Sequence, residues 1–159
     1  MIPIKVLVPS GVLGLGFDLE ALNNGVKNNP DIISIDGGST DSGPYSLGSG
    51  TSKYSRAAIK AEWKSLMIAR EKANVPLIIG SCGTCGTNGM VDWMENITIE
   101  LAEELNQNIK IAKLYCQQEK NFIKKKFQLS KIFPLNPAPM LNDHLIEEMT
   151  NIVALAGAE

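Results

Sequence analysis

Short apolar runs alternate with longer amphipathic stretches along this chain, and this alternation constrains the fold more than any other feature of the sequence. Four apolar runs have the length of strands, at residues 5–9, 31–36, 76–81 and 109–116. Apolar side chains recur at helical spacing over residues 18–27, 55–73, 90–106, 119–129 and 142–150. Strands that alternate with helices in this way form crossover units of parallel strands.

We therefore predict an α/β fold, a Rossmann-like three-layer domain with a mainly parallel sheet of five to six strands. Residues 131–135 are a candidate fifth strand, and residues 151–156 form a last apolar run. The five predicted helices are enough to cover both faces of such a sheet. We expect residues 1–159 to fold as a single α/β domain.

The composition argues against nucleic-acid and membrane partners. Hydrophobic residues make up 44% of the chain and charged residues 20%, and the formal net charge is -2. No apolar run approaches the roughly 18 residues of a membrane span. The strand-like N-terminus lacks the basic region and long apolar stretch of a signal peptide. We interpret the basic run at residues 124–126 as a solvated helix face.

Three cysteines, an odd number, in a chain without an export signal predict free thiols in a reducing cytoplasm. Cys82 and Cys85 have the C-x-x-C spacing of redox and metal motifs, and Cys116 ends the fourth apolar run. The glycines around Cys85 indicate a loop rather than the helix start that lowers a thiol pKa. We expect reduced, metal-free cysteines, while a thiol redox or metal protein stays an alternative.

Small and polar residues gather where the predicted strands end. In an open parallel sheet, ligands bind outside the carboxyl ends of the strands. Asp36 ends the second predicted strand and Asp41 follows five residues later, so the two are a candidate acid/base pair. Both would equally serve as turn caps. Arg56, in the first turn of the next predicted helix, is suited to a carboxylate or phosphate.

Glycine permits close approach of the backbone to a ligand, and successive N–H groups attract anions. The glycines of residues 11–16 reverse the spacing of the dinucleotide fingerprint, and no phosphate-binding P-loop occurs, so no cofactor is assigned. The candidate ligand-binding residues are Ser10, Gly11, Gly37, Gly38, Ser39, Thr40, Arg56, Gly80, Ser81, Cys82, Gly83 and Thr84.

Five motifs carry a resemblance to a known family. They are PSGVLGLGF from Pro9, IDGGSTDSGPYSLGSG from Ile35, SRAAIK from Ser55, LIIGSCGTCG from Leu77 and PLNPAP from Pro134. In this order they resemble the N-terminal third of the acyclic terpene utilisation (AtuA-like) family. The family usually has small residues in place of the two cysteines of the C-x-x-C, which favours a glycine-rich ligand loop.

The resemblance implies a catabolic enzyme of undefined reaction that acts on a small branched or terpenoid acid or its CoA thioester. We expect the site at the strand carboxyl ends. The residues that would line this site come from one side only, so the alternative is a non-catalytic subunit whose site is completed by a partner chain. A homodimer, or a C-terminal domain beyond residue 159, is expected to cover apolar surface near residues 152–155.

Overall fold

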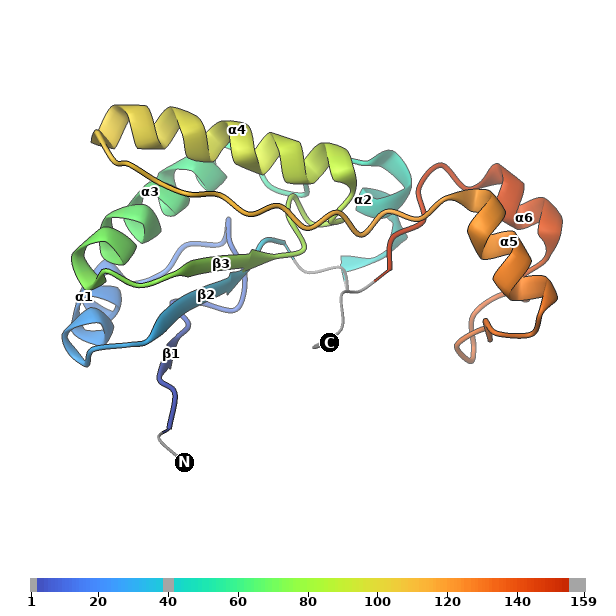
Figure 1. Cartoon of the computed structure of the whole chain (residues 1–159), viewed down its shortest axis with the longest axis horizontal. Coiled ribbons are helices and arrows are strands. Elements are labelled where there is room, and N and C mark those ends of the chain that lie inside the picture. The colour runs from blue at the N-terminus through green and yellow to red at the C-terminus, as the bar shows by residue number, and fades with distance from the viewer. Residues whose placement is uncertain (1–2, 39–41, 155–159) are drawn as a thin grey trace.

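The fold is a small parallel sheet with helices, in a computed structural model that describes residues 3–38 and 42–154 (Figure 1). The sheet has three strands in the order β1 (Val6–Leu7), β2 (Ile32–Asp36) and β3 (Leu77–Gly80). The helices in the described residues are α1 (Leu19–Lys27), α2 (Pro44–Ser49), α3 (Arg56–Ala73), α4 (Asn88–Leu105), α5 (Lys120–Gln128) and α6 (Asp143–Glu148).

The predicted five- to six-stranded, Rossmann-like three-layer sheet is wrong, because the described residues form one sheet of three parallel strands. Residues 109–116 are extended but pair with none of the three strands. Lys113 Nζ donates to Asp92 Oδ1 at 3.1 Å and to Glu95 Oε2 at 2.7 Å, and the Tyr115 hydroxyl also bonds Asp92. These contacts hold the segment along α4 instead of in the sheet. Residues 131–135 form no strand either.

Local capping chemistry explains where the two long helices begin. The Ser55 hydroxyl accepts a hydrogen bond from Ala58 N at 3.2 Å, which confirms the predicted start of α3. Thr87 caps α4, which begins two residues before the predicted start. The short helix α2 was not predicted, although Pro44 at its first turn is a helix-start signal.

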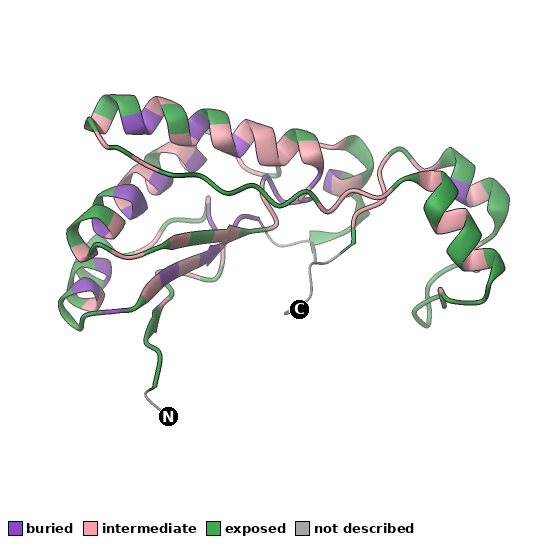
Figure 2. Ribbon diagram, in the orientation of Figure 1, coloured by how far each residue is buried: buried purple, intermediate pink, exposed green. Residues whose placement is uncertain are grey.

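The hydrophobic core lies on one side of the sheet. Ile33 and Ile35 of β2 point to the side covered by α1, α3 and α4, where Leu66 and Ile97 are fully buried (Figure 2). Right-handed crossovers between strands in the order β1-β2-β3 place their helices on the same face. This is why the three helices form one layer and not two.

Ion pairs join α3 to α4 on the outside of this layer. Lys60 Nζ lies 3.0 Å from Glu100 Oε2 and 2.5 Å from Glu104 Oε1. Lys64 Nζ lies 3.1 Å from Glu104 Oε2. Arg56 also pairs with Glu100. Hydrogen bonds from these cations lower the pKa values of both glutamates.

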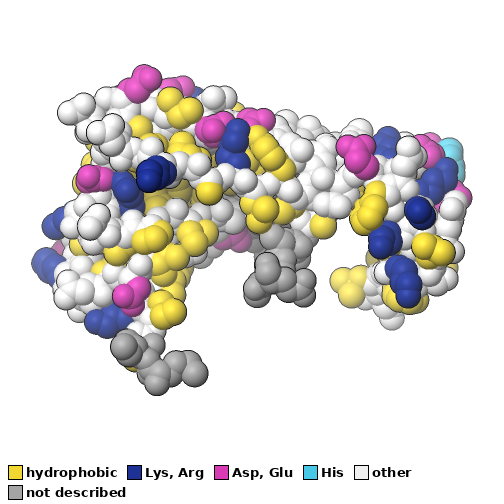
Figure 3. Space-filling view, in the orientation of Figure 1, with side chains coloured by type: hydrophobic (Ala, Val, Ile, Leu, Met, Phe, Trp, Pro, Cys, Tyr) yellow, Lys and Arg dark blue, Asp and Glu magenta, His cyan; other side chains and the backbone are white. Residues whose placement is uncertain are grey.

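The opposite face of the sheet has no helix layer in the described part of the chain. Val6 of β1 and Ile78 of β3 point to this side, and each exposes at least half of its surface. Ile4 and Val8 share the alternation of Val6 and are also exposed. We call these four residues the open face; Figure 3 shows hydrophobic side chains gathered over the sheet region.

Helices α5 and α6 stand apart from the rest of the molecule (Figure 1). Two antiparallel segments connect them to it, through Gln118 N to Ile152 O at 2.7 Å and Ala154 N to Cys116 O at 2.9 Å. We call residues 119–149 the arm. No helix within the described ranges is both long and apolar enough to cross a lipid bilayer.

Candidate functional site

The loops after β2 and β3 lie side by side, which confirms a sequence prediction. Asp36 is in register with Gly80 at the ends of the two strands. Gly37 N donates to Gly80 O at 2.7 Å, and Thr84 N donates to Gly37 O at 3.2 Å. The two glycine-rich loops therefore contact each other through their backbones at the carboxyl edge of the sheet.

The loop after β3 folds tightly because several of its residues have positive φ angles. Ser81 and Thr84 have φ values of 46° and 74°, and Gly83 has 58°. Gly83 and Thr84 are buried, and the Thr84 hydroxyl accepts a hydrogen bond from Lys53 N at 3.1 Å. The structure places these two candidate ligand residues inside the protein, while Gly80 is exposed and Ser81 and Cys82 are half-buried.

The glycine-rich loop after β1 already binds a carboxylate of the chain itself. Gly14 N and Gly16 N each donate to Glu62 of α3 at 2.7 Å. Ser10 Oγ donates to Val12 O at 2.9 Å, and the nearby Gly11 is exposed. Two of the backbone N–H groups that could attract an anion to this loop are therefore already bonded to the Glu62 carboxylate.

The remaining candidate residues belong to different elements of the structure. Asp36 Oδ1 accepts from Gly38 N at 3.0 Å, as expected of a turn-capping carboxylate. Arg56 begins α3 and pairs with Glu100 of α4. Ser39, Thr40 and Asp41 lie outside the described residues. The catalytic pair of Asp36 and Asp41 stays a prediction.

The three cysteines are free thiols. Burial raises the pKa of the Cys82 thiol to about 11, although its own backbone N–H acts in the opposite direction. Cys85 is buried, with its Sγ 3.5 Å from Thr87 Oγ1. A nucleophilic or redox-active cysteine needs a lowered pKa. Among the described residues, no three His, Cys, Asp or Glu side chains form a candidate metal cluster.

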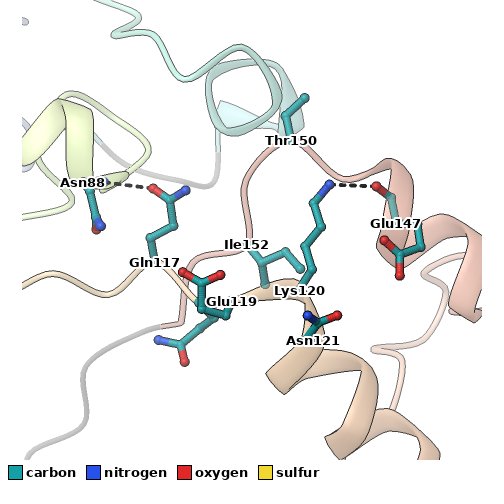
Figure 4. A pocket seen from close by; sticks show the side chains of 9 residues that line it. Asn88, Gln117, Glu119, Lys120, Asn121, Glu147, Thr150 and Ile152 are labelled. Atoms are coloured by element: carbon teal, nitrogen blue, oxygen red, sulfur yellow. Dashed lines mark hydrogen bonds between the residues drawn. The ribbon is translucent and has the colours of Figure 1, made fainter.

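A polar cleft of about 410 Å³ opens at the N-terminus of α4, beside the carboxyl edge of the sheet (Figure 4). It lies between the start of α4, the segment that leads into α5 and the segment that follows α6. Its lining residues are Asn88, Gln117, Gln118, Glu119, Lys120, Asn121, Glu147, Thr150 and Ile152. Four of the nine are carboxamides, and one, Ile152, is apolar.

Hydrogen bonds between distant segments build the cleft. Gln117 Oε1 accepts from Asn88 N at 3.2 Å, and Gln117 Nε2 donates to Asn151 Oδ1 at 3.3 Å. Asn151 Nδ2 donates to Leu47 O at 3.1 Å, and Thr150 Oγ1 donates to Gly48 O at 2.8 Å. Gln117 therefore joins α4 to the C-terminal segment, and that segment is fixed in turn to α2.

The cleft carries one ammonium group near a helix N-terminus. Lys120 Nζ donates to Glu147 O at 2.7 Å (Figure 4), while the Glu147 carboxylate pairs with Lys124 at 2.8 Å. The hydrogen bond from Lys124 lowers the pKa of Glu147. Asn88 Oδ1 is buried and has no hydrogen-bond partner among the described residues. The arrangement offers donors to a carboxylate or amide group.

Sequence reasoning missed this cleft. It predicted the ligand site in the two glycine-rich loops, whereas the cleft uses the residue just beyond them, Asn88, and two segments near the C-terminus. The one signal for the cleft in the sequence was the polar run Gln117–Gln118–Glu119 directly after an apolar stretch.

No protein-family model, curated protein or solved structure matches this chain.

Proposed function

We propose that this chain is the ligand-binding or catalytic α/β domain of a cytoplasmic catabolic protein that acts on a small branched or terpenoid acid or its CoA thioester. The cleft at the N-terminus of α4 would hold the polar end of that ligand. The observation that carries the proposal is the lining of the cleft, in which four carboxamides and Lys120 surround a space of about 410 Å³.

The position and size of the cleft support ligand binding. It lies next to the loop that leaves β3, and parallel sheets bind ligands outside the carboxyl ends of their strands. Its volume falls within the range of roughly 300–1,000 Å³ that is usual for small-molecule sites. Gln117 and Asn151 join the walls of the site through side-chain hydrogen bonds.

The carboxamides of the lining favour a ligand with amide groups, and Lys120 lies among them together with the carboxylates of Glu119 and Glu147. A carboxylate would accept from Lys120, which gives a charge-assisted hydrogen bond. The pantetheine arm of CoA contains two amide groups, which would bond the carboxamides of Gln118 and Asn121, because the Gln117 carboxamide already bonds Asn88 and Asn151. Ile152 is the single apolar residue among the described residues that line the cleft, so a hydrocarbon chain would extend out of it.

Two roles remain compatible with this site. In the first, Asp36 and the neighbouring Asp41 act as acid and base on a ligand that reaches from the cleft to the loop after β2. In the second, the chain is a non-catalytic subunit whose site is completed by a partner. The open face favours the second role, because it is a surface on which another chain would pack.

Calorimetric titration of the full chain with isovaleryl-CoA, CoA and isovalerate tests the proposal. The Lys120→Ala variant should weaken binding about tenfold, since a hydrogen bond to a charged group contributes roughly 1.5–3 kcal/mol. Lys110→Ala is the matched control, because Lys110 is exposed and does not line the cleft. Circular dichroism checks that both variants fold.

Binding that is equally strong in the Lys120 and Lys110 variants would place the ligand elsewhere. Absence of binding by all three compounds at millimolar concentration would reject the proposed ligand class.

A further inference from the structure

Residues 109–116 form an extended segment whose backbone the fold leaves unpaired. Within the described ranges, no backbone hydrogen bond joins residues 108–115 to one another or to any other part of the chain. Six of the eight residues in the segment are exposed, among them Ile111, Leu114 and Tyr115. A row of unpaired N–H and C=O groups along an extended chain is a template for pairing with another strand.

The segment is held extended by its own chain. Lys113 Nζ and the Tyr115 hydroxyl bond acidic side chains of α4, so the segment runs along that helix (Figure 1). Ile109 packs against the hydrophobic core at one end, and Cys116 O accepts from Ala154 N at the other. Because this backbone is already ordered, pairing with a second strand costs little further conformational entropy.

The side chains of the segment suit pairing with an identical strand. In an antiparallel pair centred on Ala112, the opposed residues are Ile109 and Tyr115, Lys110 and Leu114, and Ile111 and Lys113. No like charges face each other in this register, and each lysine stem lies against an apolar side chain. A register centred on Lys113 would instead oppose two ammonium groups.

We propose that two copies of this chain form a two-fold dimer through antiparallel pairing of residues 109–115, with the axis beside Ala112. The small side chain of Ala112 suits the closer, non-hydrogen-bonded pair, which places Ile111 N–H opposite the Lys113 carbonyl of the second copy. A second copy is the occupant because the segment is complementary to itself, and a two-fold axis then forms every contact twice. The dimer goes beyond the proposed function, because residues 109–115 do not line the cleft and no ligand takes part.

The first experiment measures the dimer by light scattering and native mass spectrometry on the full chain at micromolar concentration. Ile111→Pro removes an N–H that has no partner within the described chain, and the extended backbone accepts proline, so the monomer should fold. It should raise the dimer dissociation constant at least about tenfold. Ile111→Thr is the matched control, because it keeps the N–H and a β-branched side chain, and circular dichroism checks that both variants fold.

The second experiment tests the register. In the background Cys116→Ser, the variant Ala112→Cys brings two thiols together across the axis, with Cα atoms about 4.5 Å apart, which suits a disulfide. Diamide as the oxidant should therefore convert most of this variant to a covalent dimer on non-reducing electrophoresis. Ile68→Cys in the same background is the control, because Ile68 is exposed on α3, outside the paired segment.

A wild-type chain that stays monomeric would overturn the proposal. A dimer whose dissociation constant is the same in Ile111→Pro and Ile111→Thr would overturn it as well, since another surface would then hold the copies together. So would equal cross-linking of the Ala112→Cys and Ile68→Cys variants, because the disulfides would then come from random collision.

Discussion

Replacement of Gly38 by alanine tests the contact between the two glycine-rich loops. Gly38 has a φ angle of 139°, which side chains rarely allow. A Cβ atom at this position would lie 2.5 Å from Thr84 Oγ1 and 2.7 Å from Thr84 N and Cα. Because two of these atoms belong to the backbone of the neighbouring loop, the clash cannot be relieved by a side-chain rotation.

The cost of this substitution has two parts. A residue with a side chain in such a backbone conformation costs about 1–3 kcal/mol. Forcing an extra carbon into a packed site costs about 1–3 kcal/mol more. We expect Gly38→Ala to lower the free energy of unfolding by about 2–6 kcal/mol, a large part of the roughly 5–15 kcal/mol of a typical domain.

Urea denaturation followed by tryptophan fluorescence measures this change. With a slope of about 2 kcal/mol/M, the midpoint should fall by about 1 M or more. The control is Gly89→Ala in α4, where a Cβ would meet nothing within 4 Å and alanine should be neutral or stabilising by up to about 1 kcal/mol. An unchanged midpoint in Gly38→Ala would refute the loop contact.

Two further predictions concern titrating groups. Because the pKa values of Glu100 and Glu104 are lowered, their ion pairs stabilise the fold at neutral pH. This stabilisation is lost as the pH falls below the ordinary carboxyl pKa of 4.5. Thermal unfolding measured against pH should therefore show a smaller loss of stability in acid for Glu104→Gln than for the unchanged chain. Because the pKa of Cys82 is about 11, peptide mapping should find its alkylation by iodoacetamide at pH 8 about 100-fold slower than in urea, and equal rates would contradict its burial.

Local signals in the sequence were enough to predict the helices other than α2. Caps such as Ser55 and the left-handed residue Asn74, which ends α3, act within a few residues of the chain. The apolar periodicity of α3 and α4 indicated their helical character, although Ile68, which belongs to that pattern, is exposed while Ile59 and Met67 are buried. Helix boundaries were therefore accurate to about two residues, because the physics that sets them is local.

The strands needed information that a local pattern does not contain. Residues 109–116 form an apolar run with the length of a strand, and the segment is indeed extended. Whether it joins a sheet depends on a partner, and the contacts of Lys113 with Asp92 and Glu95 instead hold it along α4. The number of strands was overestimated because an extended conformation was equated with pairing.

The candidate site was predicted in part. The meeting of the loops after β2 and β3 followed from the rule that parallel strands end at the same edge. The cleft could not be predicted, since residues as distant as Asn88, Gln117 and Thr150 line it. Glycine-rich sequence indicated ligand binding at residues 80–84, but Gly83 and Thr84 are buried among the protein's own atoms.

The most direct test of the account is a map of amide chemical shifts on the nitrogen-15-labelled chain during titration with isovaleryl-CoA. We predict saturable shifts at Asn88, Gln118 and Lys120, which line the cleft, and none at Ile78 of the open face. Shifts confined to the open face, or to the glycine-rich loop with the cleft unchanged, would contradict the assignment of the ligand site.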